Sequence, residues 1–160
     1  MAVSESAFGG LRLSLLEMLE QGFNPRQKLK KLMFTKSQTQ PEVVYAVRDG
    51  KVDAGVVRTD RLERMEAAGK IDMRYFRILN NKEVRDFPFF LSTKLYPEWA
   101  FSALKHVPAT DVKAVTDFLL NITKDSQAAW LGKYVGWILP KDYAPARALM
   151  KRLRIGPYAN

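Results

Sequence analysis

The sequence contains no cysteine and only one histidine, His106. Without cysteine it can form no disulfide and offers no thiolate nucleophile, and one histidine supplies the usual first-row metal sites poorly. A catalytic triad needs a base held beside its nucleophile, and serine with one remote histidine does not provide that arrangement. We therefore predict no metal, no cofactor and no catalytic residue, and a region that is not an enzyme.

Long hydrophobic runs are also absent. No apolar stretch approaches the roughly 18 to 20 residues that a membrane helix needs, and no positively charged start leads into an apolar signal segment. Yet 47% of the residues are hydrophobic, which argues against disorder. The 160 residues suffice for one ordinary domain or for a piece of a larger, two-lobed one.

Positive charge is in excess, because 26 lysines and arginines stand against 17 acidic residues and give a net charge of +9. Anions are therefore the expected partners, and nucleic acid, an acidic lipid surface and a small anionic ligand are all compatible with charge alone. The chain has no recognisable nucleic-acid motif and no alternation of aromatic and basic residues of the kind that stacks on bases. We therefore expect no nucleic-acid partner.

Strand-like and helical patterns alternate along the chain, which predicts an α/β fold with a parallel sheet. The predicted helices cover residues 10–21, 39–49, 58–69, 97–104, 110–122, 125–134 and 144–153. The predicted strands cover residues 32–34, 51–57, 73–79 and 87–97. In the first helix, the spacing places Leu11, Leu15, Met18 and Leu19 on one inward stripe and Glu17 outside it.

Three of the predicted helices begin with residues that suit an anion. The residues at these starts are Ser4, Ser6, Phe8 and Gly9, then Thr35, Ser37, Gln38 and Thr39, and then Arg58 and Thr59. Backbone N–H groups at a helix start lack intrahelical partners and lie at the positive end of the dipole. Loops of this kind meet at the carboxyl ends of parallel strands, so we predict that they share one pocket.

Each of these residues also has a simpler structural interpretation. Ser4 and Ser6 are common helix caps, and Ser37, Gln38 and Thr39 are common turn and cap residues. Arg58 suits a solvated surface, and Phe8 suits a buried core position as well as a ligand-contacting wall beside the two glycines. The prediction of a site depends on their recurrence at three helix starts.

Several blocks of sequence resemble the periplasmic phosphate/phosphonate-binding proteins. They are "SESAFGG" before a helix, "LMFTKSQTQPEVVYAVRDGKVDAGVVRTDRLE" and "FPFFLSTKL", which match that family in order and spacing over roughly residues 2–120. The resemblance implies a type 2 periplasmic-binding-protein fold, with a Ser-rich turn and a loop like "FTGSH" among its binding segments. It implies the ligand-binding residues Ser4, Ser6, Phe8, Gly9, Thr35, Ser37, Gln38, Arg58 and Thr59.

The closing segment "GWILPKDYAPARALMKRLRIGPY" is similar to the end of such domains in sensor histidine kinases of the tetrathionate-sensor type. The resemblance implies a ligand-sensing domain at the periplasmic face of the inner membrane, followed in the full protein by a membrane helix and a kinase. The alternative is the solute-binding protein of an ABC-type anion importer, which shares the pocket and hands its ligand to a permease.

Two departures from the family pattern bear on the ligand. Arg58 and Thr59 stand where transporter members carry Asp and Ser, and Lys36 and Gln38 replace the Gly and His of the "FTGSH"-like loop. An acid that would recognise the amine of a phosphonate is thus replaced by a guanidinium, which binds two oxygens at once. We expect a fully anionic ligand, such as an oxyanion of sulfur or phosphorus, or a carboxylate.

The resemblance also divides the chain into two parts. Residues 1–86 correspond to the second lobe of the two-lobed fold, and residues 87–160 to the segment that returns to a first lobe and leads toward the membrane. The first lobe itself is missing from the matched region. We therefore expect an apolar face between Phe87 and Trp137 that a homodimer, segment exchange or another partner covers.

Two features of that second part bear on its packing. The pattern of the 110–122 helix predicts that Val112, Val115, Phe118, Leu119 and Ile122 are buried. Trp99, Trp130 and Trp137 are expected as core or interface anchors.

Overall fold

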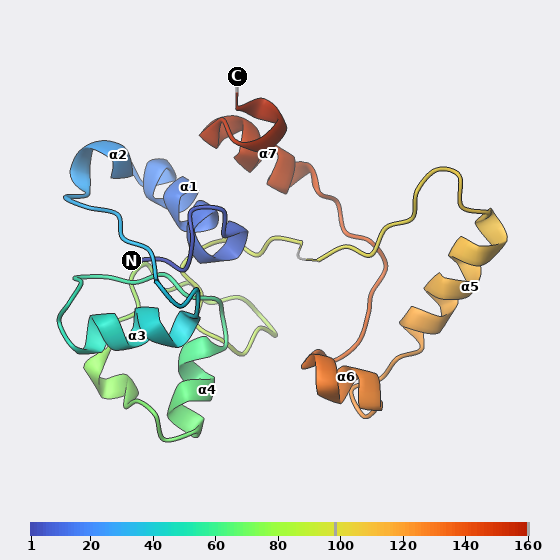
Figure 1. Cartoon of the computed structure of the whole chain (residues 1–160), viewed down its shortest axis with the longest axis horizontal. Coiled ribbons are helices and arrows are strands. Elements are labelled where there is room, and N and C mark those ends of the chain that lie inside the picture. Colours follow the sequence, from blue (N-terminus) through green and yellow to red (C-terminus); the bar gives the residue numbers. More distant parts are fainter. Residues whose placement is uncertain (98, 160) are drawn as a thin grey trace. The chain divides into compact units, whose positions relative to one another are not determined.

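The computed structural model describes residues 1–97 and 99–159, which divide into two units by their contacts (Figure 1). The first unit comprises Met1–Leu95 with Ala146–Asn160, and the second comprises Tyr96–Pro145. The helices of the first unit are η1 (Phe8–Arg12), α1 (Leu13–Glu20), α2 (Pro25–Lys28), α3 (Gln40–Arg48), α4 (Arg61–Ala67), η2 (Met73–Tyr75), nearly all of α7 (Ala144–Leu153) and η3 (Gly156–Tyr158). The second unit contains α5 (Ala109–Leu120) and α6 (Gln127–Gly132).

Backbone pairing at the centre of the first unit follows the pattern of a parallel sheet. Ala2 forms a parallel bridge with Phe34. The N–H of Ala2 donates to the carbonyl oxygen of Met33 at 2.9 Å, and the N–H of Thr35 donates to that of Ala2 at 3.1 Å. The first residues of the chain thus run beside residues 33–35 in the same direction.

The same N-terminal segment pairs on its other side with residues 54–56. The backbone nitrogen of Met1 donates to the carbonyl oxygen of Ala54 at 2.6 Å, and the N–H of Val56 donates to the carbonyl oxygen of Met1 at 2.9 Å. This exchange is also that of parallel neighbours. The three segments are therefore ordered 33–35, 1–3 and 54–56.

These pairings are too short to form strands, so the α/β prediction is confirmed only in part. Within residues 1–97 and 99–159 the structure has two isolated bridges, Ala2 with Phe34 in parallel and Lys82 with Leu91 antiparallel, and no longer strand. The strands predicted at 32–34, 51–57, 73–79 and 87–97 are wrong as continuous elements. Parallel strands are stable when both faces of their sheet are buried, whereas Leu32, Met33 and Phe34 are exposed.

The predicted 73–79 strand begins instead with a 3₁₀ turn, η2. The Asp72 carboxylate accepts a hydrogen bond from the backbone N–H of Arg74 at 2.9 Å, and its Oδ2 lies 2.6 Å from Nη2 of the Arg74 guanidinium. A cap and an ion pair on one carboxylate hold the chain in a turn. This local pairing outweighs the strand propensity of the apolar residues that follow.

The predicted helices of the first unit form close to their expected positions. α3 carries Pro41 in its first turn and buries Val43 and Val44. A side chain at Gly55 would place its Cβ 2.5 Å from Cγ1 of Val43, so the absence of a side chain lets the 54–56 segment lie against α3. In α1 the buried side is wider than predicted, because Leu16 and Glu17 are buried and Glu17 was expected outside.

The second unit is less packed than its sequence predicts. The helices expected at 110–122 and 125–134 form as α5 and α6, but no described residue of 97–104 is helical, and Glu98 of that stretch lies outside the described residues. No residue of α5 is buried, and Phe118 is 70% exposed, so the predicted burial of Val112, Val115 and Phe118 is wrong.

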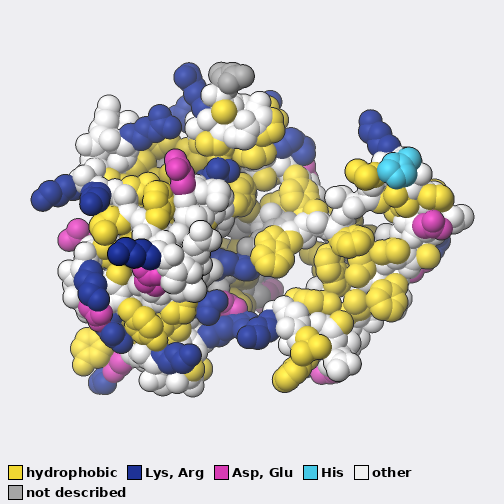
Figure 2. All heavy atoms as spheres, in the orientation of Figure 1, with side chains coloured by type: hydrophobic (Ala, Val, Ile, Leu, Met, Phe, Trp, Pro, Cys, Tyr) yellow, Lys and Arg dark blue, Asp and Glu magenta, His cyan; other side chains and the backbone are white. Residues whose placement is uncertain are grey.

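Figure 2 shows hydrophobic side chains gathered over α5 and α6. The expected exposure of apolar residues between Phe87 and Trp137 is confirmed within each unit, for example at Phe90 in the first and Phe118 in the second. Trp99 and Trp130 are exposed, while Trp137 packs edge-on against Phe101 and Tyr134, with centroids 6.2 Å and 5.9 Å apart. Among residues 1–97 and 99–159, no helix has both the length and the apolar character to cross a membrane.

Candidate ligand-binding site

The first helix start has no side-chain cap. Ser4 and Ser6 do not cap it, because their hydroxyl oxygens lie 3.2 Å apart and hydrogen-bond to each other. The chain enters the π-helical turn η1 after Ala7, whose methyl side chain provides no cap hydrogen bond. This helix start is therefore without a side-chain cap.

The two glycines of this turn play different parts. A Cβ at Gly9 would have no heavy atom within 4 Å, so the space beside this residue is open. A Cβ at Gly10 would lie 3.3 Å from the Cβ of Ala7, so Gly10 is the glycine that internal packing favours. Gly9 therefore has no packing role, and its bare backbone is accessible to a ligand.

The second helix start is tied to the first by Thr35. This side chain is buried, with 7% of its surface exposed, and its Oγ1 donates to the carbonyl oxygen of Val3 at 3.0 Å. Val3 and Thr35 each lie at the end of a paired segment, immediately before a predicted binding loop. Thr35 therefore fixes the spacing of two loops rather than presenting its hydroxyl to solvent.

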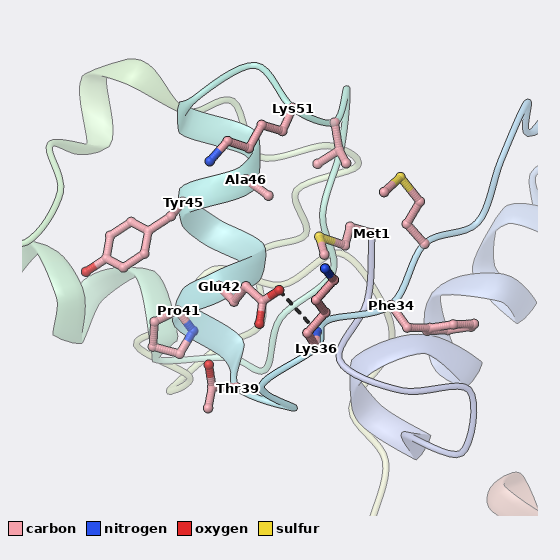
Figure 3. Close-up of a pocket in the computed structure, with 11 residues that line it drawn as sticks. Met1, Phe34, Lys36, Thr39, Pro41, Glu42, Tyr45, Ala46 and Lys51 are labelled. Atoms are coloured by element: carbon pink, nitrogen blue, oxygen red, sulfur yellow. Dashed lines mark hydrogen bonds between the residues drawn. The ribbon is translucent and has the colours of Figure 1, made fainter.

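The donors of the second loop are occupied by a carboxylate of the chain itself. Glu42 on α3 accepts a hydrogen bond from the backbone N–H of Lys36 at 3.1 Å (Figure 3). It also accepts hydrogen bonds from the backbone N–H of Ser37 at 2.9 Å and from the Ser37 hydroxyl. The Ser37 hydroxyl also lies 2.8 Å from that of Thr39. The hydrogen bonds from the Ser37 side chain, then from the two backbone N–H groups, hold the pKa of Glu42 below its ordinary value of 4.5.

The third helix start is joined to the second by Gln40. The backbone N–H of Arg58 donates to Oε1 of Gln40 at 3.0 Å. Asp60, just before α4, has a φ of 69° and pairs with Arg64 at 2.7 Å, so no side chain caps this helix start either. Gln38 in the second loop has a φ of 54°. Left-handed non-glycine residues of this kind cluster in functional loops.

The three predicted loops therefore lie in one hydrogen-bonded group. Thr35 connects the first two, and Gln40 connects the second and third. The nine predicted site residues are distributed over these loops, with Arg58 exposed and Thr59 half-buried. Among them, Thr35 and Ser37 already use their hydroxyls within the protein, since Thr35 donates to Val3 and Ser37 donates to Glu42.

Two surface depressions flank this group. One, of about 450 Å³, lies against α3 and is lined by Lys36, Thr39, Glu42 and Tyr45 among others. The second, of about 850 Å³, lies beside α1 and includes Ser6. The other eight predicted site residues line neither of these two depressions.

Sequence reasoning missed the two residues that organise the loops, Glu42 and Gln40. A signal for Glu42 was present, since Thr39 and Glu42 have the spacing of a capping box. The carboxylate reaches instead to the N–H groups of Lys36 and Ser37, further upstream. Gln40 carried no signal, because its partner Arg58 is 18 residues away.

Residues 1–150 match the family model of the periplasmic substrate-binding proteins of phosphonate ABC transporters. The chain belongs to this family. The expected membership of the phosphonate-binding family is thereby confirmed, as is the class of protein, a periplasmic binding domain.

The tetrathionate sensor histidine kinase TtrS of Salmonella typhimurium (strain LT2) is 31% identical to this chain over 156 residues. The match covers 98% of the chain and 25% of that kinase, so the chain spans about a quarter of the length of its relative. No solved structure matches the chain.

Proposed function

We propose that this chain is part of the ligand-binding periplasmic domain of a two-component sensor histidine kinase and that it recognises a small anion. The similarity to a sensor kinase along 98% of the chain supports the sensing role. The same relative is named for tetrathionate, which makes an oxyanion of sulfur the first candidate, with phosphorus oxyanions and carboxylates next.

The observation that supports this proposal most directly is that three linked helix starts lack side-chain caps. η1, α3 and α4 all begin without a side-chain cap, and their loops are linked through Thr35 and Gln40. Elsewhere in the same unit α2 has such a cap, because Asn24 accepts from the backbone N–H of Arg26 at 3.1 Å. Helix starts without side-chain caps that lie in linked loops favour the binding of an anion, because the helix dipole is positive there.

In this proposal the nine predicted residues have complementary roles. Ser4, Ser6 and Gly9 present hydroxyl and backbone donors, Phe8 contacts the ligand, and Thr35, Ser37, Gln38 and Thr59 complete the other two loops. Arg58 supplies the positive charge, and its forked guanidinium suits two oxygens of one anion. No chemical step is required, since the domain acts by binding.

Signalling would follow from closure of two lobes around the ligand, transmitted through α7 toward the membrane. We propose that the remainder of a longer protein supplies the first lobe, the membrane helix and the kinase, and that the domain lies at the periplasmic face of the inner membrane. The first lobe would complete a site to which this chain contributes one side.

A thermal-shift panel tests the anion-binding claim. Tetrathionate, thiosulfate, phosphate and succinate are added separately to the chain, to Arg58→Ala and to Arg77→Ala, an exposed control. We expect at least one anion to raise the melting temperature of the chain and of the control but not of Arg58→Ala. Equal stabilisation of both variants would remove Arg58 from the site.

The alternative function is the solute receptor of an anion importer, which the description of the matched family favours. An importer receptor would use the same pocket, but it would hand its ligand to a permease instead of passing a signal to a kinase. The gene beyond Asn160 distinguishes the two: a membrane segment and a kinase domain support sensing, and a stop codon supports transport.

A further inference from the structure

The second depression is a groove between two ends of the first unit. It has a volume of about 850 Å³ and lies between α1, the stretch after α2 and the end of α7. Figure 2 shows Lys and Arg side chains gathered over this part of the molecule. The cations that line the groove are Arg12, Arg26, Lys30, Lys31, Arg152 and Arg154, together with one acid, Glu5.

The charges of these six cations are not balanced by a direct partner among the described residues. Within residues 1–97 and 99–159, no ion pair or cation–π contact involves any of them. Other cations of the same unit have partners, such as Lys82 with Glu17 at 2.9 Å and Arg64 with Asp60 at 2.7 Å. Six unpaired cations thus lie on one concave surface, where their fields add.

The net charge of the chain is distributed unevenly between the two units. Residues 96–145 contain five lysines, no arginine and five acidic residues, so the second unit has no net charge. The net charge of +9 belongs entirely to the first unit. An anionic partner is therefore drawn to the first unit rather than to the chain as a whole.

The groove also has an apolar lining. Its apolar residues are Leu11, Leu15, Leu19, Pro25, Leu29, Leu32, Leu153 and Ile155. No Phe, Tyr or Trp is among its lining residues, so it offers no platform for stacking bases. A groove lined by both aliphatic side chains and arginine and lysine suits a molecule with an anionic head and an aliphatic tail.

We propose that this groove binds an anionic phospholipid of the membrane surface. The lipid phosphate would lie among the six cations, and the glycerol backbone and upper acyl chains would lie against the leucines. A small oxyanion would use two or three of these cations and none of the apolar lining. The groove shares only Ser6 with the proposed ligand site, so an experiment can contradict one proposal without contradicting the other.

Vesicle co-sedimentation of the full 160-residue chain tests the proposal. One set of vesicles is phosphatidylcholine alone, and the other contains about one quarter phosphatidylglycerol. We expect binding to the anionic vesicles only, weakened by salt. The variant Lys30→Gln/Lys31→Gln/Arg152→Gln/Arg154→Gln is expected to bind at least about tenfold more weakly.

A matched variant separates the groove from general charge. Lys70→Gln/Arg77→Gln/Lys105→Gln/Lys124→Gln removes the same charge from exposed positions outside the groove and is expected to keep most of the binding. Equal loss in both variants, or no binding to anionic vesicles, would overturn the proposal.

Soluble competitors identify the chemistry that the groove recognises. Short-chain dihexanoyl phosphatidylglycerol below its micelle concentration should displace the protein from vesicles, and glycerol phosphate at the same concentration should not. Equal displacement by glycerol phosphate would mean a phosphate site without a lipid. Stronger displacement by duplex DNA of equal phosphate content would mean a nucleic-acid surface, and either result would contradict the proposal.

Discussion

The Glu42 carboxylate accepts a 2.9 Å hydrogen bond from the backbone N–H of Ser37 and holds the loop in which an anion is expected to bind. An acid of the chain therefore occupies donors at one of three adjacent helix starts. A ligand that approaches the second loop must either displace Glu42 or bind the donors of the first loop and Arg58. If the ligand binds the donors of the first loop and Arg58, the second loop supports the site without contacting the ligand.

Replacing Glu42 by glutamine should lower stability and raise anion affinity. The neutral amide accepts weaker hydrogen bonds from Lys36 and Ser37, and a negative charge beside the site is removed. The melting temperature and the anion dissociation constant report the two effects separately. Glu83→Gln, at an exposed position, is the control for loss of one charge.

The stabilisation by Glu42 should depend on pH in a defined direction. Its pKa is lowered in the folded protein by the hydrogen bonds from Ser37 and Lys36, so the unfolded chain takes up a proton first as the pH falls. The contribution is fully present above the unfolded pKa, near 4.5, and is lost as the pH falls through the lower folded value. The melting temperatures of the wild type and Glu42→Gln should therefore differ at neutral pH and converge in acid.

Gly55→Ala should destabilise the first unit by roughly 1–3 kcal/mol, because the new Cβ would lie 2.5 Å from Val43 on α3. Urea unfolding measures the change. Gly9→Ala is the matched control, since its Cβ meets no heavy atom within 4 Å and should leave stability close to wild type. Weaker anion binding by Gly9→Ala would support close backbone approach of the ligand at that residue.

Glu17→Gln should lower the free energy of unfolding by roughly 1–3 kcal/mol, because a buried carboxylate with charged and polar partners is replaced. Burial alone would raise the pKa of Glu17, but hydrogen bonds from Lys82, Asn80 and Gln21 outweigh it and lower the pKa. Glu20→Gln is the control. Its exposed pairing with Lys94, at 3.6 Å, should contribute less than about 1 kcal/mol. Equal losses in both variants would contradict the structural role of Glu17.

We propose that the apolar surface of the second unit associates with a second copy when no other partner covers it. The unit has no net charge to oppose association, and Phe118 and Trp130 are 70% and 75% exposed. Light scattering should show a mass that rises with concentration in the wild type and less so in Phe118→Lys. Ala114→Lys is the control, because it adds the same charge to α5 but keeps the aromatic ring of Phe118, and it should associate more than Phe118→Lys does. A wild-type protein that is monomeric at every concentration would contradict the association.

Helices were predictable from the sequence because their signals are local. Pro41 near the start of α3, the glycine after α4 and the apolar spacing of α5 each act within a few residues. The strands could not be predicted in the same way, because a strand forms only by pairing with segments that are distant in sequence. Here Ala2 has neighbours at residues 33–35, but the pairing extends over one bridge. The predicted burial of α5 was wrong for the same reason, because residue spacing indicates an apolar face but does not show which part of the protein covers it.

The candidate site was predictable in its residue types and less so in its internal hydrogen bonds. The pattern of helix starts led to Ser4, Ser6, Thr35 and Arg58, and the structure joins their loops. It also shows that Thr35 donates to Val3 and that Glu42 occupies the donors of Ser37. Such pairings follow from tertiary geometry, which the order of residues along one loop does not specify. The binding roles of the nine residues stay predictions.

Backbone amide NMR during anion titration tests the central claim most directly. Tetrathionate, thiosulfate and phosphate are each added to the isotope-labelled chain, and amide shifts are mapped onto the sequence. Binding at the three helix starts predicts the largest shifts at Phe8, Gly9 and Gly10, with further shifts near Arg58. Shifts confined to the groove around Lys30 and Arg152, or no shifts with all three anions, would contradict it.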